Sequence, residues 1–205
     1  MAGLTAARVR ANLERVRAEI GEGVTVLAAV KYLPAEDLGA LAEAGIEVVG
    51  ENRAQELEVK AAAHPELRWH FIGQLQSRKV RQIVPLVELI HSVASESALR
   101  QLERHGTPET RVLVEVNVAG EAGKAGIAPG ELGDFIARCP VTVDGLMTMP
   151  PYTEDPEASR PCFAKLAELG ARHGLRELSM GTSQDYAVAA QEGATIVRLG
   201  TVLYD

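Results

Sequence analysis

Hydrophobic residues along the chain follow two alternating patterns. Eight short segments rich in Val, Ile and Leu are typical of strands buried in a parallel sheet. Between them, apolar residues recur at the spacing of one helix face. The expected strands span residues 24–31, 47–52, 67–73, 86–93, 111–117, 141–148, 177–181 and 195–201. The helical stripes include Leu38 with Leu41, Leu99 with Leu102, Leu132 with Phe135, and Phe163 with Leu166.

This alternation predicts a parallel α/β sheet. Eight strand–helix units favour a closed barrel, because closure removes both exposed edges of the sheet. We therefore expect one domain over residues 1–205, a (β/α)8 TIM-like barrel over 24–205 preceded by an extra helix within 1–23. That helix has one apolar face, formed by Val9, Leu13, Val16 and Ile20, which could cover the barrel bottom or pack outside it. An open doubly wound sheet is the structural alternative.

The composition narrows the class of protein. Apolar residues make up 46% of the 205 residues, enough for a sizeable core, and the net charge of −7 argues against nucleic acid as a partner. No apolar run is long enough to span a membrane and no signal peptide is recognisable, so we expect a cytoplasmic protein with no membrane partner. Cys139 and Cys162 belong to no Cys or His cluster, so neither a metal nor a disulfide is indicated.

Polar side chains close several of the expected strands. Lys31 ends the apolar run 24–30, where the cost of burying an ammonium should exclude it unless it has a role. The other strand ends carry Asn52, His70, Met147, Arg198 and Gly200 with Thr201. The carboxyl ends of barrel strands meet at one mouth, where α/β barrels bind ligands. Each residue also has a plain structural explanation: Lys31 as the first solvated loop residue, Asn52 as a helix cap, His70 as a core histidine and the methionines as gap fillers.

Two segments predict a phosphate site more specifically. Ser183 follows a glycine where a helix is expected to begin, and Gly200-Thr201 follows an apolar strand. A helix start and a glycine turn both present free backbone N–H groups, and barrels commonly bind phosphate after strands seven and eight. Arg198 lies two residues before Gly200, on the same inward face, and we expect it to need a ligand heteroatom or a carboxylate as acceptor.

Seven motifs, in order along nearly the whole chain, resemble one family. They are AAVK at 28–31, GENRAQE at 50–56, WHFIGQLQSRK at 69–79, IHSV at 90–93, GLMTMPP at 145–151, LSMGTS at 178–183 and VRLGT at 197–201. The chain resembles the pyridoxal phosphate homeostasis proteins, also called the proline synthase co-transcribed or YggS-like family. Tyr32, Thr182 and a short tail depart from the usual family pattern.

The resemblance implies a barrel like the alanine racemase N-terminal domain, with pyridoxal 5′-phosphate at its mouth. By motif, Lys31 resembles the lysine that forms a Schiff base with the cofactor, and Arg198 the partner of the pyridine nitrogen. Ser183, Gly200 and Thr201 resemble the phosphate ligands, while Asn52, Met147 and Ser179 resemble residues that line the pocket. An arginine beside the ring nitrogen keeps the ring unprotonated and weakens it as an electron sink.

Three functions compete at this stage. The first, implied by the family, is a carrier or buffer of pyridoxal phosphate in vitamin B6 and amino-acid homeostasis, with no robust turnover. It would act as a monomer and exchange cofactor with pyridoxal phosphate-dependent enzymes. The second is a small racemase-like enzyme, which needs a further base from His70, Tyr152 or a partner chain. The third is a barrel enzyme whose Lys31 condenses with a substrate carbonyl, as in aldolases.

Overall fold

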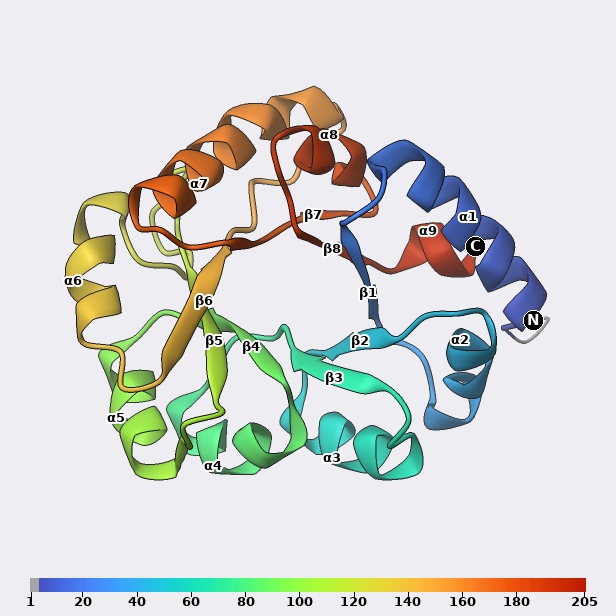
Figure 1. The fold of residues 1–205 in the computed structure, drawn as a ribbon, viewed down its shortest axis with the longest axis horizontal. Helices are drawn as coiled ribbons and strands as arrows, with labels where there is room; N and C mark the ends of the chain where they lie inside the picture. The colour runs from blue at the N-terminus through green and yellow to red at the C-terminus, as the bar shows by residue number, and fades with distance from the viewer. Residues whose placement is uncertain (1–3) are drawn as a thin grey trace.

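The computed structural model describes residues 4–205, in which eight parallel strands close into a barrel in chain order, with β8 pairing β1 (Figure 1). The strands are β1 Thr25–Ala29, β2 Val48–Glu51, β3 Arg68–Phe71, β4 Leu89–Val93, β5 Arg111–Glu115, β6 Thr142–Met147, β7 Glu177–Thr182 and β8 Ile196–Leu199. The predicted (β/α)8 fold is confirmed, and the open sheet is excluded.

Helices surround the strands on the outside of the barrel (Figure 1). They are α1 Ala6–Ile20, α2 Gly39–Glu43, α3 Ala54–Ala63, α4 Val80–Ile83, α5 Glu96–His105, α6 Leu132–Ala137, α7 Arg160–Arg172, α8 Tyr186–Gln191 and α9 Thr201–Tyr204. Several are only one or two turns long, and single 3-10 turns such as Ala35–Asp37 and Pro156–Ser159 lead into the next helix. Short helices explain how eight strand–helix units fit into so short a chain.

The predicted N-terminal helix packs outside the barrel. Thr5 caps α1 by accepting a hydrogen bond from Arg8 N at 3.4 Å, and Gly21 ends it with a φ of 76°. Its predicted apolar face is buried and lies against α2, α8 and α9. Asn12, also buried, donates to Leu203 O at 3.1 Å and so ties α1 to α9. Figure 1 shows the two helices side by side.

A small apolar core lies inside the barrel. It consists of Leu27, Val48, Leu89, Leu113, Met147 and Ile196, packed with Ile72. Gly50 is required here, because a Cβ at that position would lie 2.5 Å from Leu27 Cδ2. Larger apolar residues fill the layer between strands and helices.

Several strands end earlier than the sequence predicts. Strand β1 stops at Ala29 and β8 at Leu199, so Lys31 and Thr201 lie beyond their strands. The ladder continues one bond further, from Val30 N to Gly50 O at 2.9 Å, and then Leu33 N bonds to Val30 O at 3.1 Å. The turn therefore takes the carbonyl that a longer strand would have used. Within residues 4–205, no helix combines the length and apolarity that a membrane span requires.

Candidate functional site

Lys31 lies in the turn that follows β1, at the carboxyl end of the barrel. Its side chain is exposed, with Nζ 4.6 Å from the centre of the Tyr32 ring. The expectation of a costly buried ammonium is therefore wrong, because the strand ends two residues earlier. Strand β1 lies between β2 and β8, so Lys31 emerges between the segments that carry Asn52 and Gly200.

The predicted phosphate segments meet at one hydroxyl group. Ser183 Oγ accepts hydrogen bonds from Gly200 N at 3.0 Å and from Val202 N at 3.4 Å. Thr201 begins α9, whose first N–H groups have no acceptor within the helix. Ser183 itself lies in a turn before α8, which begins at Tyr186 rather than at Ser183 as predicted. The cradle thus comprises one hydroxyl and several convergent backbone N–H groups, which suits an anion.

Arg198 is buried beside this cradle. Its Nη1 donates to Ser179 O at 2.8 Å and to Ser179 Oγ at 2.6 Å, and its Nη2 donates to Thr148 O at 3.0 Å. Burial lowers its pKa to about 10, opposed by the negative charges of Glu115 and Asp185. The expectation that Arg198 needs a ligand or a carboxylate as acceptor is wrong, since carbonyl and hydroxyl oxygens serve. The guanidinium keeps its positive charge with no direct ion pair among residues 4–205.

Two histidines extend this polar cluster across the barrel. His91 Nδ1 lies 2.8 Å from Ser179 Oγ, and His91 Nε2 lies 3.0 Å from His70 Nδ1. Burial is the main cause that lowers the pKa of His70 to about 3 and that of His91 well below its usual value. Both rings are therefore neutral near pH 7. His70 is too weak a base, and too firmly bonded to His91, to act as the base considered above.

A buried ion pair supports the chain around Lys31 and Asn52. Lys60 Nζ donates to Glu51 Oε2 at 2.6 Å and to Val30 O at 2.9 Å. The other carboxylate oxygen of Glu51 accepts from Asn52 N at 2.6 Å. Lys60 and Glu51 are both almost wholly buried, so each charge depends on the other. The pair fixes the backbone immediately before Lys31 to the end of β2.

Asn52 does not cap the next helix, because α3 begins after Arg53 without a side-chain cap. Its Oδ1 atom is buried and meets no hydrogen-bond donor among the described residues. Such an atom is costly unless a further group supplies a donor. Together with the anion cradle and the charged Arg198, it fits a ligand that has a phosphate, a ring nitrogen and further polar substituents.

Met147 and Ser179 face each other across neighbouring strands in the barrel interior, with Glu115 next to Met147 on β5. Burial raises the pKa of the Glu115 carboxyl, while Arg198 lowers it. Tyr152 is 76% exposed and Met149 is 52% exposed, both in the loop after β6. That loop and the turn at Thr182–Asp185 line a cavity of 230 Å³ beside Ser183.

Comparison with known proteins decides the family. The family described as "Alanine racemase, N-terminal domain" matches residues 4–205. A pyridoxal phosphate homeostasis protein of Aquifex aeolicus is 41% identical over 96% of this chain and 96% of its own length. That of Pseudomonas aeruginosa is 37% identical, covering 94% of this chain and 93% of its own. The chain belongs to the pyridoxal phosphate homeostasis protein family.

Solved structures agree with this membership. PipY of Synechococcus elongatus, solved with PLP bound, superposes with a TM-score of 0.84 at 32% identity, covering 96% of this chain and 100% of that chain. Alanine racemase from Corynebacterium glutamicum has a TM-score of 0.79 at 14% identity, and the match covers 62% of that chain. This second likeness shows the shared barrel fold alone.

The site residues that the motifs singled out lie at or near the carboxyl ends of the barrel strands, where Arg198 contacts Ser179 and Ser183 contacts the Gly200 turn, and the structure adds further polar residues to them. His91, Glu115, Glu51 and Lys60 were assigned no role by the sequence argument. Alternation from Leu89 to His91 and from Leu113 to Glu115 is the signal that places the first two inside the barrel. No comparable signal pairs Lys60 with Glu51, because the sequence pattern of a helix does not distinguish a buried lysine from an exposed one.

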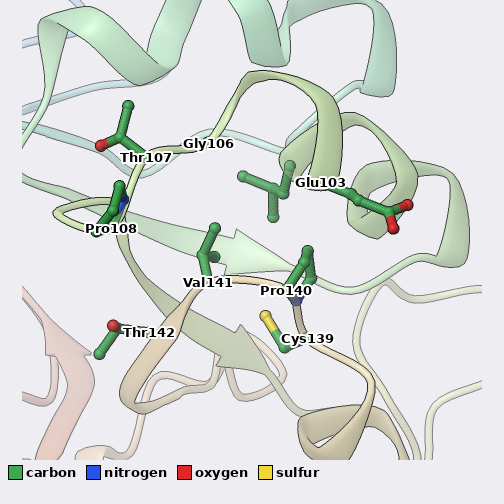
Figure 2. A pocket seen from close by; sticks show the side chains of 9 residues that line it. Glu103, Gly106, Thr107, Pro108, Cys139, Pro140, Val141 and Thr142 are labelled. Atoms are coloured by element: carbon green, nitrogen blue, oxygen red, sulfur yellow. The ribbon is translucent and has the colours of Figure 1, made fainter.

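A second cavity lies at the other end of the barrel. It has a volume of 500 Å³ and is lined by residues before β5 and β6, including Gly106, Thr107, Cys139 and Val141 (Figure 2). Burial raises the pKa of the Cys139 thiol, which makes it a poor nucleophile. Since it opens at the amino ends of the strands, this cavity is separate from the candidate site.

Proposed function

We propose that this chain binds pyridoxal 5′-phosphate at the mouth of the barrel and carries or buffers it in vitamin B6 and amino-acid homeostasis. One observation carries the proposal: Ser183, Gly200 and Val202 form an anion cradle next to the buried charge of Arg198. The names of the relatives and the PLP-bound PipY structure support the same ligand.

In this proposal each residue has a separate task. Ser183, Gly200 and Thr201 bind the phosphate, Arg198 donates to the ring nitrogen, and Asn52, Met147 and Ser179 line the pocket. The cofactor supplies an aldehyde, with which Lys31 forms a Schiff base. Lys31 follows β1, beside the Gly200 turn that follows the neighbouring strand β8, and its exposure leaves the amine accessible.

The covalent link gives a direct test. After borohydride reduction of the protein loaded with pyridoxal phosphate, peptide mass mapping should locate the label on Lys31. The K31A variant should lose the visible absorption band, and the K165A variant, changed on the outer helix α7, should keep it. Label on Lys60, Lys79 or Lys165 instead would overturn the assignment of Lys31.

The carrier role is favoured because His70 and Tyr152, the two residues of this chain first considered as a second base, are poorly suited to that task. A racemase must remove the α-proton of the amino acid on one face of the cofactor ring and return a proton to the same carbon on the other face. His70 is neutral and weakly basic, and Tyr152 is 76% exposed in the loop after β6. We expect at most slow α-proton exchange when the protein is incubated with L-alanine in deuterated water, and no racemic product.

A racemase-like enzyme is the second candidate, and Glu115 is the observation that favours it. Its carboxyl belongs to the last residue of β5, next to Met147, and burial raises its pKa while Arg198 lowers it. Rapid racemisation that is lost in both K31A and E115Q would establish the enzyme and refute the carrier proposal. Loss in K31A alone would leave another residue as the second base.

The proposal also includes a cytoplasmic monomer that exchanges cofactor with pyridoxal phosphate-dependent enzymes. The chemistry of exchange suits the exposed Lys31, because an incoming amine can reach it from solvent. Light scattering should give the mass of one chain. Transfer should appear as activation of a cofactor-free enzyme by the loaded protein, faster than by the same amount of free cofactor.

A further inference from the structure

Four polar side chains form a continuous row across the barrel interior, and the proposed function uses only two of them. His70 on β3, His91 on β4, Ser179 on β7 and Arg198 on β8 are each exposed by 5% or less. The row is linked by contacts of 3.0 Å between the two rings, 2.8 Å from His91 to Ser179 Oγ, and 2.6 Å from Ser179 Oγ to Arg198. It joins strands from opposite sides of the barrel.

The donors and acceptors in this row can be assigned from one end. Arg198 has only donors, so Ser179 Oγ must accept from it. The hydroxyl proton of Ser179 is then free to be donated to His91 Nδ1. His91 in turn carries its proton on Nε2 and donates it to His70 Nδ1, which leaves the His70 proton on its own Nε2. With Ser179 as the donor to His91, all the bonds run in one direction, from Arg198 to His70.

The row works only while both rings are neutral. A proton on His91 Nδ1 would face the hydroxyl that already accepts from Arg198, and would place a second cation near the first in a dry interior. Burial, the neighbouring ring and the charge of Arg198 all disfavour that proton. A carboxylate in place of His91 would instead attract the Arg198 guanidinium and offset the positive charge that Arg198 presents to the mouth.

We propose that His91, backed by His70, is a positioning residue that orients the Ser179 hydroxyl and thereby holds the guanidinium of Arg198 aimed at the ring of the bound cofactor. The inference deepens the proposed function and rests on it for the identity of the ligand. Neither histidine touches the ligand in this proposal. Both act through Ser179.

The first arm of the test needs no cofactor. Nitrogen-15 NMR of the histidine rings in the protein without ligand should show His91 and His70 neutral near pH 7, each with its proton on Nε2. A charged ring, or a proton on Nδ1 of His91, would overturn the inference. This result is independent of whether pyridoxal phosphate is the ligand.

The second arm compares variants loaded with pyridoxal phosphate. H91L removes the acceptor for the Ser179 hydroxyl. The dissociation constant for pyridoxal phosphate should then rise about tenfold or more, because Arg198 is no longer held in the direction of its charge-assisted hydrogen bond to the cofactor. The visible absorption band of the bound cofactor should shift as well. H91Q should restore both, because its amide oxygen can accept from Ser179 while its NH2 group donates to His70.

L113A provides the matched control, since Leu113 is fully buried in the barrel interior and belongs to no polar contact of the row. It should lower stability without moving the absorption band. If a folded H91L binds with the affinity and spectrum of the parent, or if L113A shifts the band as H91L does, His91 has no positioning role. Failure of the parent to bind the cofactor would refute the proposed function instead, and the NMR arm would still decide the row.

Discussion

Acid should destabilise this protein through its two buried histidines, well before the carboxylates titrate. In the folded state burial lowers the pKa of His70 to about 3, whereas the unfolded chain has the ordinary value of 6.5. Between these values the unfolded state binds a proton that the folded state does not. Stability is therefore complete above pH 6.5 and is lost as the pH falls.

The magnitude follows from the size of that window. Each pH unit between the two pKa values costs about 1.4 kcal/mol, so lowering the pH from 7 to 5 removes about 2 kcal/mol through His70 alone. His91 acts in the same direction, because its pKa is also far below the ordinary value. Glu115 acts in the opposite direction, since burial raises its pKa and favours the protonated folded state at low pH. For a domain of ordinary stability the histidine effect is a large fraction of the total.

Urea unfolding of the cofactor-free protein, followed by circular dichroism at several pH values from 7 to 5, measures the effect. The H70N/H91N double variant should lose most of this pH dependence, while the carboxylate contributions stay the same as in the parent. L113A should be less stable than the parent by a similar amount at each pH. Equal slopes for the parent and the double variant would refute the argument that both rings are buried and neutral.

Three further outcomes follow from contacts around the mouth. G73A should destabilise the fold by about 1–3 kcal/mol, measured by urea unfolding, because a Cβ there would lie 2.1 Å from Asn52 O. K60M should cost about 3–5 kcal/mol by leaving Glu51 buried and unpaired, and adding E51L should recover most of the loss; equal stability of the single and double variants would contradict this. Pyridoxal, which lacks the phosphate, should bind far more weakly than pyridoxal phosphate in a fluorescence titration, by about 1.5–3 kcal/mol for each hydrogen bond to the phosphate that is lost. S183A should narrow this difference in affinity between the two ligands.

The fold was predictable because its signal is local and repeated. Each strand is marked in the sequence by a short apolar run. Strict alternation of these strands with helices leaves few topologies other than a parallel barrel. The inward positions of Met147, Ser179 and Arg198 follow from the period of two along each strand. The meeting of Ser183 with the Gly200 turn was predictable for a similar reason, since a glycine turn after β8 and a serine before α8 are features of single segments.

The contacts within the site were not predictable, because they join residues far apart in the chain. His91 and Ser179 are separated by 88 positions, and their hydrogen bond depends on how β4 and β7 face each other across the interior. The exposure of Lys31 depends on a turn bond from Leu33 N to Val30 O, which competes with one more rung of the ladder. The periodicity of the sequence does not indicate which of these two hydrogen bonds forms.

The helix added before the barrel contributes to the site as well as to the core. The N–H groups that form the cradle belong to the start of α9, and Asn12 on α1 holds the other end of α9 through Leu203 O and Asp205 O. Tyr204 completes the link, because its hydroxyl donates to Ala29 O at 3.1 Å, at the end of the strand that leads to Lys31. Burial raises the pKa of this hydroxyl, so it stays a donor. Through these contacts α1 steadies α9, and α9 in turn connects the Gly200 turn to the end of the strand that leads to Lys31.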